Sequence, residues 1–95
     1  GENISATEVE ECLAQCEGVT DVAVIGVADE ICGEKVLAIV VTGEEPGVLE
    51  EQLRAHCTQK LAAFKWPAEY VMVVGLPYTA TGKIDRKELM RRYRR

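Results

Sequence analysis

Residues 19–43, VTDVAVIGVADEICGEKVLAIVVTG, hold two apolar runs on either side of a polar segment. The runs, VTDVAVIGV and EKVLAIVVTG, are rich in valine and isoleucine, which favour strands. We therefore predict two strands, with ADEICGE at residues 28–34 as the glycine-containing turn between them. A third run, EYVMVV at residues 69–74, predicts one more strand.

Helical patterns flank these strands. Residues 4–18 begin with Ser5 and Glu8 at the spacing of a capping box, and Gly18 is expected to stop that helix. A second helix is predicted over residues 48–61, after a break at EEPG. Its apolar stripe consists of Leu49, Leu53, Cys57 and Leu61.

A final helix is predicted from the capping pair Asp85 and Glu88 through Tyr93. The order is thus helix, two strands, helix, strand, loop and helix. Ninety-five residues suffice for one small domain. We predict an α+β fold, a central three-stranded sheet with flanking helices.

Charge and composition narrow the classes of function. Residues 86–95 hold six basic residues and one acid, a net of +5, so the overall charge of −5 leaves residues 1–85 with a net of −10. With such an acidic body, we interpret the basic end as a solvated helix terminus and expect no nucleic-acid partner. No run approaches the ~20 apolar residues of a membrane span, and no secretory signal is visible. We expect a cytoplasmic chain, and its start without Met indicates a piece of a longer protein.

The cysteines are Cys12, Cys16, Cys32 and Cys57, and reduced thiols are expected. Their spacing matches no common zinc-ligand pattern, so we interpret them as small apolar residues and predict no metal site. The sole histidine, His56, has no visible catalytic partner and is predicted to lie at the surface or the edge of the core.

The segment LPYTATGKID, residues 76–85, places Lys83 directly after Gly82. It is not a nucleotide-binding P-loop, because six residues separate Gly75 from Gly82 where that motif has four, and Ile84 replaces its Ser or Thr.

The loop has its own chemistry. Pro77 stiffens its entry, Thr79 and Thr81 can form local hydrogen bonds, and Gly82 permits a tight backbone. Such a loop could hold the Lys83 ammonium toward a phosphate or carboxylate oxygen, although surface lysines are more often simply solvated.

Residues 77–86, PYTATGKIDR, resemble the last core motif of the adenylate-forming enzymes, which include acyl-CoA synthetases, peptide-synthetase adenylation domains and luciferases. The opening GENISATEVE, residues 1–10, is similar to the segment that follows the interdomain hinge in that superfamily. Residues between these motifs follow the same pattern. The resemblance covers essentially the whole chain, with acyl-CoA synthetases as the most similar group.

This resemblance implies that residues 1–95 form a mobile C-terminal lid domain. A large N-terminal domain, absent from this chain, would bind ATP, Mg²⁺ and a carboxylic acid. Lys83 would be the catalytic lysine of adenylate formation, on a loop supported by Thr79, Thr81 and Gly82. The chain alone would be inactive.

The resemblance also implies a second orientation, in which the domain rotates and presents part of a CoA and pantetheine site. The residues implied at that site are Gly1, Glu2, Asn3, Phe64, Lys65 and Trp66. Cys32 stands where many relatives have tryptophan, and Tyr78 stands where a basic residue is frequent.

Two alternatives stay open at the level of the sequence. The GENIS opening favours CoA as the acceptor, but an enzyme that loads the acyl group onto a carrier protein would have a similar C-terminal domain. A non-catalytic module that binds a protein or phosphate ligand is the third reading, motivated by the basic end of the chain.

Overall fold

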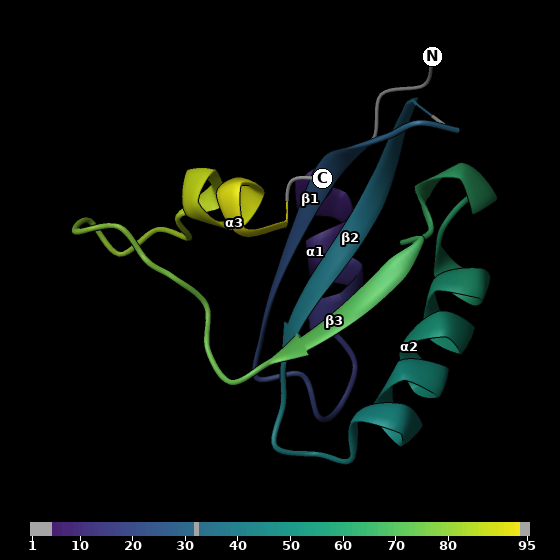
Figure 1. The fold of residues 1–95 in the computed structure, drawn as a ribbon. Helices are drawn as coiled ribbons and strands as arrows, with labels where there is room; N and C mark the ends of the chain where they lie inside the picture. The colour runs from purple at the N-terminus through teal and green to yellow at the C-terminus, as the bar shows by residue number, and fades with distance from the viewer. Residues whose placement is uncertain (1–4, 32, 94–95) are drawn as a thin grey trace.

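The computed structural model describes residues 5–31 and 33–93. The elements run in the order α1 (Ala6–Ala14), β1 (Asp21–Asp29), β2 (Gly33–Val41), α2 (Pro46–Lys60), the 3₁₀ turn η1 (Ala63–Lys65), β3 (Glu69–Val73) and α3 (Arg86–Tyr93). Figure 1 shows α2 and α3 on opposite sides of the sheet, with a long excursion of chain between β3 and α3.

The three strands form one sheet in the order β1-β2-β3. β1 and β2 are antiparallel, from Asp21 opposite Val41 to Asp29 opposite Gly33. This hairpin confirms the two predicted strands, but the predicted turn at residues 28–34 was too long, because both strands extend into it. β3 runs parallel to β2, so the chain must cross over between them, and α2 makes that crossing.

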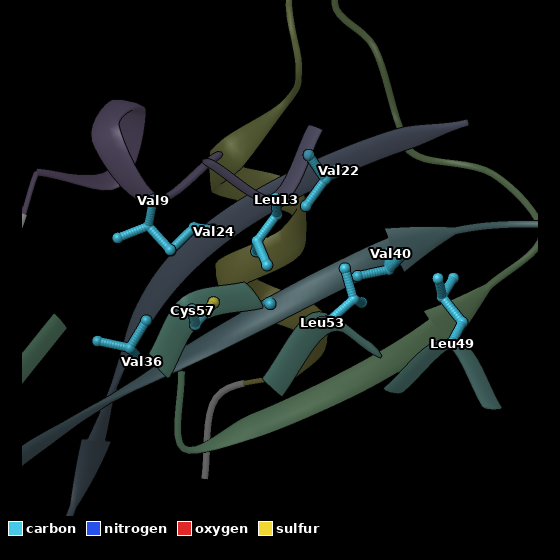
Figure 2. Packing of buried hydrophobic residues seen from close by; sticks show 10 residues of the cluster. Val9, Leu13, Val22, Val24, Val36, Val40, Leu49, Leu53 and Cys57 are labelled. Carbon is cyan, nitrogen blue, oxygen red and sulfur yellow. The ribbon is translucent and has the colours of Figure 1, made fainter. Parts of the chain in front are cut away.

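Alternate residues of each strand face opposite sides of the sheet, as the period of two requires. One side packs against α1 and α2. The buried members of this first cluster are Val9, Leu13, Val22, Val24, Val36, Ala38, Val40, Leu49, Leu53 and Cys57. Figure 2 shows the side chains of both helices directed toward the strand valines.

The other side of the sheet packs against α3. This second cluster consists of Ala23, Ile25, Val27, Leu37, Ile39 and Leu89. Both faces of β1 and β2 are therefore covered, which explains why these strands are apolar at nearly every position. The predicted α+β architecture, with a three-stranded sheet and flanking helices, is confirmed.

The helix boundaries differ slightly from the predicted ones. The Ser5 hydroxyl caps α1 by accepting from the Glu8 N–H at 3.3 Å, as predicted. α1 ends at Ala14, however, and Gly18, with φ +94°, lies in the turn that follows. α2 begins at Pro46 rather than after it, because proline fits the first turn of a helix, where its missing N–H has no partner to lose.

Within the described residues, no helix has both the length and the apolar character needed to cross a bilayer.

Candidate functional site

The lysine loop, defined here as residues 74–85, connects β3 to α3. Its base is narrow, because Tyr78 and Ile84 form an isolated antiparallel bridge. The Asp85 N–H donates to the Pro77 carbonyl at 2.9 Å and so closes the two sides of the loop below the bridge. Residues 79–83 therefore form a tip held on a two-stranded stem.

The tip is a tight turn organised around Thr79. The Thr79 N–H donates to the Lys83 carbonyl at 2.7 Å, and the Thr79 carbonyl accepts from the Gly82 N–H at 3.0 Å. The Thr79 hydroxyl accepts from the Lys83 N–H at 3.3 Å and lies 3.0 Å from the Thr81 hydroxyl. Gly82 has φ +84°, a backbone conformation that side chains with a Cβ disfavour. The three predicted supporting residues thus lie together at the base of Lys83.

Lys83 itself is exposed. Its ammonium has neither a hydrogen bond nor an ion pair with residues 5–31 or 33–93. A cation on a closed turn, with no partner in the described part of the chain, is available to an external anion.

Tyr78 attaches the lysine loop to the start of β1, since its hydroxyl donates to Asp21 Oδ2. This hydrogen bond, ahead of a small desolvation, raises the pKa of the Tyr78 hydroxyl. The second Asp21 oxygen accepts from the Val22 N–H at 3.0 Å, so the carboxylate is held from both sides. The Tyr78 side chain thus attaches the lysine loop to the body of the domain.

The second candidate surface, Phe64, Lys65 and Trp66, lies in and after η1. Phe64 and Trp66 are 46% and 39% exposed, too much for core residues. The Trp66 indole N–H donates to the Leu61 carbonyl at 2.9 Å, which fixes the ring while leaving part of it open to solvent.

Lys65 already has partners in this structure. Its ammonium lies 2.7 Å from Glu8 Oε1 and 5.5 Å from the centre of the Phe64 ring. A phosphate at Lys65 would therefore have to compete with the Glu8 carboxylate.

A groove of about 210 Å³ lies beside Trp66. Its lining consists of Arg54, Cys57, Thr58, Trp66, Pro67 and Tyr70. The Arg54 guanidinium stacks 4.9 Å from the centre of the Tyr70 ring, and the same side chain pairs with Glu50 at 3.0 Å. The Glu50–Arg54 helix pair is what the i, i+4 spacing favours. Nothing in the sequence predicts that Arg54 and Trp66 line the same groove.

The two candidate surfaces lie at opposite ends of β3. Residues 64–66 precede its first residue, Glu69, and the lysine loop follows its last, Val73. Five residues of strand span roughly 16 Å at ~3.3 Å per residue. Figure 1 shows the corresponding green segments leaving β3 in different directions. The structure therefore does not bring Lys83 together with Phe64 or Trp66.

Three of the four cysteines meet between α1 and α2. Cys12 and Cys57 are buried, as predicted for small apolar residues, and Cys16 is half-buried. Burial, followed by the proximity of Cys57, raises the pKa of both the Cys12 and the Cys16 thiols. Among residues 5–31 and 33–93, no group of acidic, histidine and cysteine side chains is placed to hold a metal ion.

His56 lies at the edge of the core, as predicted, with its Nε2 atom buried and without a hydrogen-bond partner among the described residues. Gly1, Glu2 and Asn3, predicted at the pantetheine site, lie outside the described residues, as does Cys32.

The chain matches the model of the AMP-binding enzyme C-terminal domain over residues 8–83. It is 45% identical over 91 residues to the 4-chlorobenzoate–CoA ligase of Pseudomonas sp. strain CBS-3, covering 95% of this chain and 17% of that protein. It is 42% identical over 93 residues to the 2-succinylbenzoate–CoA ligase of Listeria monocytogenes serotype 4b strain F2365, covering 98% and 20%.

Among solved structures, the fatty acyl CoA synthetase of Mycobacterium tuberculosis superimposes with a TM-score of 0.91 and 38% identity, covering 98% of this chain and 18% of that one. The chain thus spans about a fifth of the length of the curated relatives it matches.

Proposed function

Because the chain belongs to the family of AMP-binding enzyme C-terminal domains, we propose that it is the mobile C-terminal domain of an ATP-dependent, AMP-forming carboxylic acid–CoA ligase. One observation carries the proposal. Lys83 stands exposed on a turn that Thr79 closes with three hydrogen bonds, and its ammonium has no partner in the described part of the chain.

In the adenylation orientation, Lys83 contacts the substrate carboxylate and the α-phosphate. Negative charge accumulates where the carboxylate attacks phosphorus, and a fixed cation in a site that excludes water stabilises it. The closed turn limits the conformational entropy that Lys83 loses when it is positioned. The large N-terminal domain would supply most of the ATP and Mg²⁺ site.

In the thioester-forming orientation, the domain turns its other end toward the same active site. The two candidate surfaces lie at opposite ends of β3, so a single orientation of the domain cannot present both to the same active site. This supports the assignment of the two half-reactions to two orientations. The exposed ring of Trp66 suits stacking on adenine, with Phe64 beside it. Lys65 would exchange its Glu8 partner for a phosphate of CoA.

The test is Lys83→Ala in the full-length protein, assayed in the two half-reactions. The carboxylic acids after which the relatives are named, such as 4-chlorobenzoate and 2-succinylbenzoate, form the substrate panel. With the best acid, ATP–pyrophosphate exchange should fall by about two to three orders of magnitude, the effect of removing one positioned charge donor. Thioester formation from supplied acyl-adenylate and CoA should be unchanged.

Lys87→Ala is the matched control, because Lys87 is an exposed lysine of α3 and its removal changes the net charge equally. It should alter exchange less than about twofold, as expected for a surface side chain. An equal loss in both half-reactions for Lys83→Ala would contradict the assigned role.

The acceptor thiol is tested separately, with CoA and with a phosphopantetheinylated carrier protein offered to the same enzyme. We expect turnover with CoA. Turnover with the carrier and none with CoA would replace the CoA ligase by a carrier-loading enzyme.

A further inference from the structure

An ion pair across the outer edge of β1 links α1 to α3. The Arg86 guanidinium donates to both Glu10 carboxylate oxygens, with Nη1 2.7 Å from Oε2 and Nη2 2.8 Å from Oε1. The two residues are 76 positions apart in sequence. Two parallel charge-assisted hydrogen bonds of this kind fix the orientation of both side chains as well as their distance.

Both residues of the ion pair also form hydrogen bonds with the backbone of β1. Val24 donates its N–H to Glu10 Oε2 at 2.7 Å, and its carbonyl accepts from Arg86 Nη1 at 3.1 Å. β1 is an edge strand, whose outer backbone groups would otherwise lack a strand partner. Glu10 and Arg86 thus take the place of a neighbouring strand at Val24 and bind to the backbone of the sheet edge.

Arg86 begins α3 directly after the base of the lysine loop. The preceding residue, Asp85, caps α3 by accepting from the Glu88 N–H at 3.1 Å, and it closes the loop through its bond to Pro77. Lys83 is three positions before Arg86 in the sequence. The position of Arg86 on β1 therefore sets where the stem of the lysine loop leaves the domain.

We propose that Glu10 is a positioning residue for the reaction of Lys83, acting through Arg86. The inference depends on the proposed function, because the only role that it gives Glu10 is to hold the Lys83 ammonium in position. A displacement of about 1 Å at a reacting group can cost on the order of 100-fold in rate. Without the Glu10 carboxylate, Arg86 would no longer be held at the Val24 carbonyl. The stem of the lysine loop would then shift together with Arg86.

The test uses the full-length protein carrying Glu10→Gln, which keeps the shape of the side chain and its bond to Val24 but removes the charge that orients Arg86. We expect the kcat of adenylate formation to fall by about 10- to 100-fold. The KM for ATP and thioester formation from supplied acyl-adenylate should stay unchanged. Glu11→Gln, an equal change at an exposed position of α1, should behave like the parent protein.

A double-mutant cycle separates positioning from a general structural role. If Glu10 acts only through Lys83, Glu10→Gln should cost little further activity in the Lys83→Ala background, because the positioned cation is already gone. Additive losses, or an equal loss in both half-reactions, would overturn the proposal. The Lys83→Ala variant alone tests the proposed function. Unchanged adenylate formation in Lys83→Ala would refute that function. Impaired Lys83→Ala beside a fully active Glu10→Gln would refute only the present inference.

Arg86→Lys provides a second variant for the case in which Glu10→Gln does not fold. Lysine keeps the positive charge, but it cannot form bidentate hydrogen bonds with Glu10 and also donate to the Val24 carbonyl. The adenylation rate should lie between those of the parent and of Arg86→Ala, with thioester formation again unchanged. Parental adenylation in Arg86→Lys and Arg86→Ala would also overturn the proposal.

Discussion

At the scale of single residues, the lysine loop depends on one threonine and one glycine. Thr79 closes the turn with its N–H, its carbonyl and its hydroxyl, and Gly82 provides the left-handed backbone that the closure requires. A Cβ at Gly82 would meet no atom within 4 Å. The requirement for glycine is therefore one of backbone conformation and not of space.

Gly82→Ala should consequently strain the turn without filling any volume. A left-handed conformation costs a residue with a Cβ about 1–2 kcal/mol, and we expect the turn to relax and release Lys83. If the full-length protein has the proposed activity, ATP–pyrophosphate exchange should fall about tenfold, the rate equivalent of ~1.4 kcal/mol, with thioester formation spared. Gly75→Ala is the control, since Gly75 lies in the same loop in open space and without a positive φ. Equal effects of both substitutions would refute the backbone argument.

At the scale of elements, α3 carries several basic residues and one acidic residue, Glu88, within the same helix. Glu88 Oε2 lies 2.6 Å from Arg91 and 2.9 Å from Arg92. These hydrogen bonds, first to Arg91 and then to Arg92, lower the pKa of Glu88 from its usual 4.5 to about 2. At least two of the basic residues are therefore paired within the helix, which accords with the interpretation of the basic end as a solvated helix terminus.

The stability of α3 should depend on pH through Glu88. A carboxylate with a lowered pKa in the folded state contributes stability above about pH 4.5, and that contribution is lost as the pH falls through about 2. Glu88→Gln should slightly lower the Tm of the 95-residue chain at pH 7, and the difference should disappear near pH 2. High salt should reduce it, because the groups are exposed.

Thermal unfolding followed by circular dichroism between pH 7 and pH 2 measures the effect. Glu51→Gln, at an exposed position of α2, controls for the loss of one negative charge. A Tm difference for Glu88→Gln that persists unchanged at pH 2 would show that the ion pairs are not its source.

At the scale of the whole molecule, the sheet separates the two candidate surfaces. The lysine loop and residues 64–66 leave β3 at opposite ends, and both faces of β1 and β2 are used for packing. Among the described residues, one surface carries an exposed ammonium, and the other carries exposed rings beside a groove of about 210 Å³. The proposed function requires both surfaces to complete a site on another domain.

The isolated 95-residue chain should therefore show no ATP–pyrophosphate exchange with any acid of the panel. As the described residues form them, neither candidate surface surrounds a nucleotide and a carboxylic acid, so we expect no reaction between the two at either surface. Exchange above the level of a Lys83→Ala preparation of the same chain would contradict this prediction.

The elements were predictable because their signals are local. Valine-rich runs, the capping residues Ser5 and Asp85, and the glycine before Lys83 act within a few positions, and the structure has strands, caps and a positive φ at those places. The errors concern boundaries. Strand pairing extends β1 and β2 into residues 28–34, α2 takes Pro46 into its first turn, and α1 ends at Ala14, before Gly18.

By itself, the sequence determined that this chain has three strands between helices and carries a lysine on a tight loop. Backbone preferences and apolar periodicity depend on residues only a few positions apart, so the sequence alone reveals them. Only the tertiary structure decided that β3 lies parallel to β2, that Tyr78 reaches Asp21 and that Arg86 reaches Glu10. Those contacts join residues 57 and 76 positions apart. The burial of two apolar faces brings such residues together, and nothing in the adjacent sequence specifies their partners.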